Sequence, residues 1–207
     1  MNRTLSVSLL FLLMFLSVGA LFSAGLDGRI RAFYLPSFSV YDKGSGVSGL
    51  VTSHDFYDNP SLSGELLYNY GAFSVGLSGE IFWGCEKPNE SQSSYFHGVN
   101  ISFKGIYNFE MTEDNKLVMP MAISLGMGFG KLTYRAPFVE RNFDATSPLL
   151  GLELGVEKFF YHWLAVGGSL EYNFLEYSMK EPSEEIFPDV NLSAVSIGLV
   201  VRGRIKF

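Results

Sequence analysis

The stretch that decides the fold is AFSVGLSGEIFW, which spans residues 72–83. Its odd-numbered positions form an apolar row that includes one glycine and ends in an aromatic residue: Phe73, Val75, Leu77, Gly79, Ile81 and Trp83. Its even-numbered positions are mostly small or polar. A period of two is typical of a β-strand, because successive side chains point to opposite faces of the sheet. The stretch therefore predicts a strand with one apolar face and one polar face.

The same alternation recurs along the chain and gives eight predicted strands. Their ranges are 27–35, 61–70, 72–83, 94–107, 116–134, 147–159, 162–176 and 192–207. Each is close to or above the roughly 9–11 residues that a tilted strand needs to cross a bilayer. Short links at 70–71, 108–115 and 160–161 alternate with longer links at 36–60, 84–93, 135–146 and 177–191. We therefore predict an all-β fold: a closed, eight-stranded, antiparallel transmembrane barrel of up-and-down topology. The short turns and both chain ends lie in the periplasm.

Composition agrees with this fold class and excludes some partners. The chain has 207 residues, of which 15% are aromatic and 17% charged, and its net charge is −6. This length allows one domain, and an acidic chain does not favour nucleic acid as a partner. Cys85 is the single cysteine, so an internal disulfide cannot form.

The N-terminus has the layout of a secretory signal peptide. It begins Met1-Asn2-Arg3, continues through an apolar run at 5–18, and reaches small residues at 19–20 and 23–25. We expect cleavage after Ala20 or near Ala24, which divides the chain into a signal peptide at 1–24 and a barrel domain at 25–207. The alternative is an uncleaved membrane anchor, but the apolar run is short for a span.

The C-terminal strand ends on an aromatic residue. Phe207 follows apolar residues at alternate positions, which are Leu199, Val201 and Ile205, with Gly203 as the weak position. This ending resembles the signal by which the barrel-assembly machinery recognises outer-membrane barrels. At the level of pattern, the chain resembles the small, porin-like outer-membrane barrels of OmpA, OmpX and OmpW type. The resemblance implies a bacterial outer-membrane location, contact with outer-membrane lipid and lipopolysaccharide, and no cofactor. We expect a monomer, although the sequence leaves the oligomeric state open.

The inward-facing row carries many charges. An eight-stranded barrel is wide enough only for side chains or for one small ligand. Unpaired charges in such an interior are costly, so we expect these side chains to form ion-paired networks or to keep water. The first case gives a polar plug in the lumen. The acidic members are Glu65, Glu80, Glu153, Glu157 and Glu171, and the basic members are Arg29, Arg31, Lys104, Arg202, Arg204 and Lys206.

Near the outer rim the inward row becomes apolar. The residues concerned are Phe33, Leu35, Phe82, Phe96, Leu132, Leu149 and Leu175. One interpretation is an apolar upper pocket, similar to the hydrophobic passage of OmpW-like barrels, which would admit a small hydrophobic ligand. The other is a one-residue shift of register that turns these side chains outward into an aromatic girdle.

A third interpretation is a lipid A-modifying enzyme, because some eight-stranded barrels have that activity. Such chemistry needs a histidine next to a serine nucleophile. None of His54, His97 and His162 has a serine two positions away on the same face, which is the spacing the lipid A deacylases imply. We therefore expect no catalytic, cofactor or metal site. The expected function is a non-enzymatic barrel with a narrow or plugged lumen that serves envelope structure or surface interaction. OmpW-like passage is the alternative.

Overall fold

The computed structural model describes residues 24–35, 38–42, 54–56, 59–89, 92–112, 116–136, 139–180, 188–191 and 194–206. Almost all of the predicted signal peptide lies outside the described residues, as does Phe207 of the predicted assembly signal. Within the described residues, no helix is long and apolar enough to cross a membrane.

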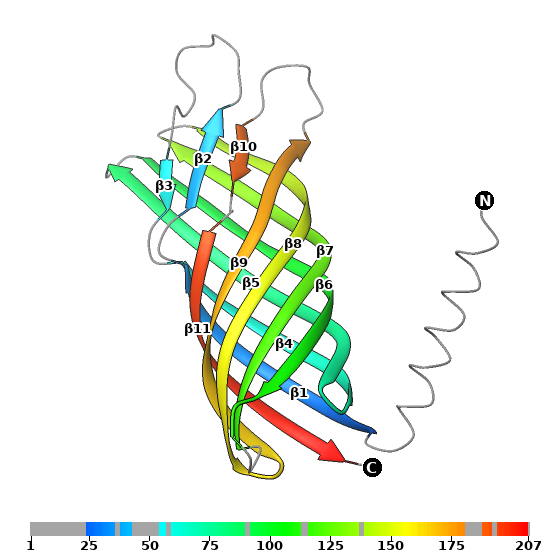
Figure 1. The fold of residues 1–207 in the computed structure, drawn as a ribbon. Helices are drawn as coiled ribbons and strands as arrows, with labels where there is room; N and C mark the ends of the chain where they lie inside the picture. The colour runs from blue at the N-terminus through cyan, green and yellow to red at the C-terminus, as the bar shows by residue number, and fades with distance from the viewer. Residues whose placement is uncertain are drawn as a thin grey trace, which may run out of the picture.

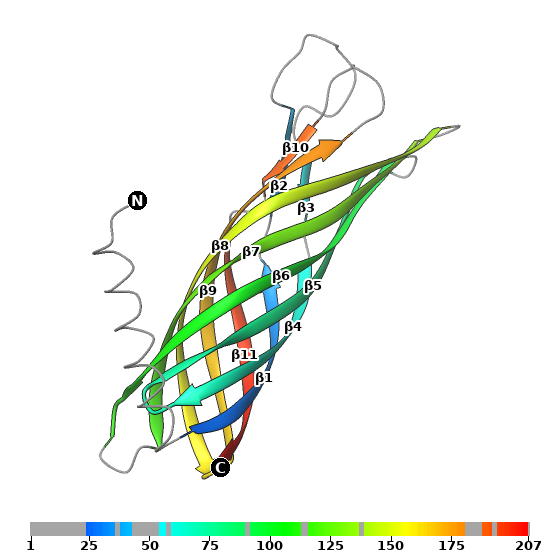
Figure 2. The ribbon, with the colours of Figure 1, turned by 90° about the vertical axis from the view of Figure 1, so that its right-hand side faces the viewer.

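Eight long strands form one closed antiparallel sheet (Figure 1 and Figure 2). They are β1 (Ala24–Leu35), β4 (Asn59–Tyr70), β5 (Phe73–Asn89), β6 (Gln92–Glu110), β7 (Leu117–Ala136), β8 (Val139–Tyr161), β9 (Leu164–Lys180) and β11 (Ala194–Lys206). Consecutive long strands pair, and β11 pairs with both β9 and β1. The all-β, up-and-down, eight-stranded barrel is therefore confirmed.

Two of the predicted outer loops contain short strands. β2 (Phe38–Asp42) and β3 (His54–Phe56) lie in the first of these loops, and β10 (Pro188–Asn191) lies in the last. β10 pairs with β9 and with β2, and β2 pairs with β3. These strands extend the sheet at the outer end, above the barrel in Figure 1.

The two other predicted outer loops are largely strand, which corrects the predicted boundaries. β5 and β6 remain paired as far as Asn89 and Gln92, and β7 and β8 remain paired as far as Ala136 and Val139. The apolar outward row, which set the predicted ends, stops where the strand leaves the bilayer. Backbone pairing needs no such row, so the hairpins continue beyond it.

The two faces of the wall differ as the alternation predicts. Leu77 is 63% exposed and its neighbour Ser78 is 6% exposed, while Leu199 is 72% exposed and Val200 is completely buried. In water an apolar surface that covers a whole barrel would aggregate, whereas in a bilayer it contacts lipid.

Aromatic pairs mark the end of the barrel that carries the short turns. The rings of Tyr161 and Trp163 stack with centroids 5.7 Å apart at the β8–β9 turn. The rings of Phe73 and Tyr107 lie 5.0 Å apart near the β4–β5 turn. Gly71 forms that turn with a φ of 72°, a backbone conformation that favours glycine. This end, where β1 begins and β11 ends, is the periplasmic end.

Candidate functional site in the barrel interior

Arg29 lies at the centre of the charged interior. Its guanidinium donates hydrogen bonds to Glu65 on β4 and to Glu153 on β8, both at 2.8 Å, and to Glu157 at 2.7 Å. The side chain of Arg29 is completely buried, and those of its three partners are at most 1% exposed. Each guanidinium nitrogen thus donates to a carboxylate, which offsets the cost of removing the charge from water.

Two further cations complete this layer. Arg31, one inward position above Arg29, pairs with Glu65 at 2.7 Å, with Glu153 at 2.8 Å and with Glu171 at 2.5 Å. Lys104, which reaches in from β6, pairs with Glu65 at 2.8 Å and also with Glu153. Glu65 and Glu153 therefore each contact all three cations. The chain brings these groups together from β1, β4, β6, β8 and β9.

A second charged layer lies toward the periplasmic end. Asp27 accepts hydrogen bonds from both Arg202 and Arg204, the latter through Nε at 2.9 Å. Arg202 also donates to Asn108 at 2.7 Å and to Glu157 at 3.2 Å, which connects the two layers.

The sequence analysis missed Asp27, although it lies two and four residues before Arg29 and Arg31 on the same inward row. It also assigned Asn108 to a turn, whereas β6 extends to Glu110. Lys206 is exposed and lies outside the buried network, which corrects its predicted place there. Both faces of a strand end contact solvent, so the period of two does not distinguish an inward from an outward side chain at Lys206.

Glu80 is bonded toward the apolar part of the interior. Its carboxylate accepts a hydrogen bond from Nδ2 of Asn100 at 2.9 Å, and Oδ1 of Asn100 accepts one from the Tyr177 hydroxyl at 2.7 Å. Asn100 thus links the Glu80 carboxylate with the Tyr177 hydroxyl.

Apolar side chains fill the interior above this layer. Phe33, Phe82, Phe96, Leu132, Leu149 and Leu175 all point inward and are between 0% and 6% exposed. All but Phe33 share one cluster with Phe143, Ala145 and Tyr177. The ring centroids of Phe82 and Phe96 lie 5.7 Å apart, and those of Phe96 and Tyr177 lie 5.2 Å apart. We call the residues of this cluster the apolar plug.

The orientation of the rim residues separates the two interpretations. The inward orientation excludes the girdle, and the low exposure shows that the described side chains pack against one another. The side chain of Leu35 lies outside the described part of the chain. Sequence analysis missed Phe143 and Tyr177 because it assigned both to outer loops, where their inward alternation could not be recognised.

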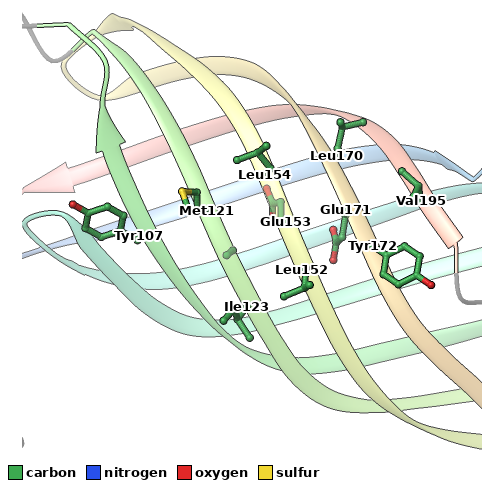
Figure 3. A pocket seen from close by; sticks show the side chains of 11 residues that line it. Tyr107, Met121, Ile123, Leu152, Glu153, Leu154, Leu170, Glu171, Tyr172 and Val195 are labelled. Atoms are coloured by element: carbon green, nitrogen blue, oxygen red, sulfur yellow. The ribbon is translucent and has the colours of Figure 1, made fainter.

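The wall between the charged interior and the lipid is one strand thick. In Figure 3, Leu152, Leu154 and Leu170 project from the outer face of β8 and β9, beside a shallow apolar hollow of about 630 Å³. The alternate residues Glu153 and Glu171 are cross-strand neighbours on the opposite face. The period of two thus places carboxylates and lipid-facing leucines next to one another in sequence without placing them in one environment.

The histidines do not form a catalytic arrangement within the described residues. His97 and His162 are exposed, and the side chain of His54 lies outside them. The cross-strand neighbours of His97 are Trp83 and Lys131. The described residues also contain no group of three or more His, Cys, Asp or Glu side chains that could hold a metal ion.

A closed barrel with an apolar exterior and a charge-paired interior defines an integral β-barrel protein of the bacterial outer membrane. Solved structures with the same fold include Ail, the attachment invasion locus protein of Yersinia pestis, at 12% identity and a TM-score of 0.50. That comparison covers 88% of this chain and 99% of Ail. A major outer membrane protein from Thermus thermophilus matches at 9% identity and a TM-score of 0.49, with coverages of 88% and 99%. Neisserial surface protein A matches at 14% identity and a TM-score of 0.48, over 88% of this chain and 97% of that protein. At these identities the likeness concerns the fold alone. Searches of protein-family models and of curated proteins found no match.

Proposed function

We propose that this protein is a non-enzymatic outer-membrane barrel with a plugged lumen, which serves envelope structure or surface interaction through its outer hairpins. The observation that carries the proposal is the burial of two successive layers across the interior. In the ion-paired layer, the side chains of Arg29, Lys104 and Glu65 are completely buried. In the apolar plug above it, Phe96 and Tyr177 are completely buried.

A conducting pore needs a continuous path of water, because an ion that leaves water for a dry interior pays a large desolvation penalty. Side chains along such a path would be exposed to solvent. The central charges instead satisfy one another, and the apolar plug offers no polar partner to an ion apart from the Tyr177 hydroxyl, which is bonded to Asn100. Both layers therefore oppose ion passage.

The outer hairpins offer a surface for the proposed role. Beyond Trp83 and Phe129, which end the apolar outward rows of β5 and β7, the β5–β6 and β7–β8 hairpins continue through Asn89 and Ala136. In Figure 2 these strands extend past the rest of the barrel wall. Paired strands hold a fixed shape, so they offer a rigid surface to a partner outside the cell.

The test is single-channel conductance of the refolded protein in a planar bilayer, compared with the variants Glu153→Gln and Lys158→Gln. Heat-modifiable gel migration confirms folding of each protein before the recording. We expect no channel openings from any of the three proteins, because the apolar plug is intact in each. Reproducible openings that change with Glu153→Gln but not with the exposed control Lys158→Gln would show a continuous polar path and overturn the plugged lumen.

A second candidate function is passage of a small hydrophobic molecule. It is favoured by the apolar character of the outer interior, but entry requires the apolar plug to open because its side chains are packed. Liposomes that contain the protein should take up a fluorescent apolar solute no faster than protein-free liposomes. Faster uptake, abolished by Phe96→Trp, would favour passage over the plugged barrel.

A further inference from the structure

We propose that a pocket at the periplasmic mouth of the barrel binds the phosphate headgroup of an anionic phospholipid from the inner leaflet. The pocket has a volume of about 310 Å³, and its lining comes from every periplasmic turn and from the end of β11. The turns that line it and the end of β11 lie at the lower end of the barrel in Figure 1. This inference is independent of the role proposed for the lumen and the outer hairpins.

The lining of the pocket is rich in cations. These are Lys116 at the start of β7 and Arg204 and Lys206 on β11. The exposed His162 of the β8–β9 turn also lines the pocket. Glu110 is the one carboxylate among the described lining residues. A phosphate has the charge and the acceptor oxygens that guanidinium and ammonium groups bind.

Arg204 is held in place at the floor of the pocket. Asp27 accepts hydrogen bonds from its Nε at 2.9 Å and its Nη2 at 3.4 Å, and the ring of Phe159 lies 4.8 Å from the guanidinium carbon. Arg202 contacts the same Asp27 carboxylate, so one carboxylate faces two guanidinium groups. The side chain of Arg204 keeps 18% of its surface exposed, and that part is available to a ligand.

The position of the pocket selects a lipid as the source of the phosphate. Phe160 and Tyr161 line the pocket and are 60% and 61% exposed, and Tyr161 stacks on Trp163. Exposed aromatic residues at a barrel rim mark the headgroup level of the bilayer. A ligand in this pocket therefore has cations on one side and lipid-facing aromatic rings on the other, which matches an amphiphile with an anionic head.

The test uses Trp163 as a local reporter. The chain has two tryptophans, so Trp83→Phe leaves Trp163 alone beside the pocket. This parent protein is refolded into phosphatidylcholine bilayers that contain either brominated phosphatidylglycerol or brominated phosphatidylcholine. Quenching of the Trp163 fluorescence by each brominated lipid measures the relative binding of the two lipids. We expect a preference for phosphatidylglycerol of about fivefold, the contribution of one cation close to an anionic lipid surface.

The main variant is Lys206→Gln, because Lys206 is exposed and lies outside the buried network, so its loss should not impair folding. We expect its preference to fall to about half of the parent value or below. The matched control is Lys158→Gln, which removes an exposed cation from the outer face of β8 at the same end but outside the pocket lining. Its preference should equal that of the parent.

Three outcomes would overturn the proposal. Equal quenching by the two lipids would mean that the pocket does not recognise an anionic headgroup. An equal loss in Lys158→Gln and Lys206→Gln would mean diffuse surface charge instead of a pocket. Loss of the preference in inorganic phosphate, but not in chloride of equal ionic strength, would mean that the pocket takes phosphate from solution.

Discussion

Replacement of Glu153 by glutamine should destabilise the barrel strongly. Glu153 contacts Arg29 and Arg31 at 2.8 Å each and also Lys104, and its side chain is 1% exposed. Glutamine keeps the shape of the side chain but removes its negative charge, so three buried cations lose a shared counterion. Removal of one partner from a buried ion pair costs about 3–5 kcal/mol. Since the glutamine oxygen still accepts one hydrogen bond, we expect a loss of about 3 kcal/mol in the free energy of unfolding.

The assay is a urea titration of protein refolded into lipid bilayers, followed by tryptophan fluorescence and by heat-modifiable migration. The control variant is Glu140→Gln, which removes a carboxylate exposed on the outer part of β8 and should leave the midpoint almost unchanged. The double variant Glu153→Gln with Lys104→Met should recover about 1 kcal/mol or more, because it also removes one of the three cations that share the remaining carboxylates.

A Glu153→Gln loss below about 0.5 kcal/mol, the size of a typical surface substitution, would refute this reasoning. It would mean that water reaches the network and screens its charges. The same result would also weaken the plugged lumen, because a solvated charged layer could conduct ions.

Three further predictions concern other parts of the barrel. Gly76→Ala should abolish refolding, because its new Cβ would lie 2.0 Å from the Leu66 carbonyl oxygen. The control Gly79→Ala on the same strand meets open space and should refold normally. Heat-modifiable migration measures refolding of both variants, and normal refolding of Gly76→Ala would contradict the close approach of the strands. Tyr177→Phe should lower the free energy of unfolding by about 1–3 kcal/mol, since the buried Asn100 loses its donor; an unchanged urea midpoint would count against that bond. Incubation with lipopolysaccharide should release no acyl chain, and release would reverse the non-enzymatic proposal.

Sequence reasoning recovered the eight strands and the direction of most side chains. The reason is that the stretch at 72–83 and its counterparts separate lipid-facing from inward-facing residues at every second position. It was weaker at strand ends. The outer extensions of β5 to β8 and the short strands β2, β3 and β10 lie beyond the apolar outward rows that set the predicted strand ends. Phe143 and Tyr177 were missed for this reason, Asn108 was assigned to a turn, and Lys206 was placed inside.

By itself the sequence determined the strand count, the closed antiparallel topology, the apolar exterior and the identity of most of the inward charges. It did so because these properties depend on a local period of two, which each segment displays independently. Only the tertiary structure decided which charges meet. Glu65 and Glu153 each contact the same three cations because the tilt and stagger of the strands bring side chains of β1, β4, β6 and β8 to one height. It also decided that the described apolar residues at the outer end pack against one another, since a row of inward phenylalanines and leucines in sequence is equally compatible with an open pocket and a packed core.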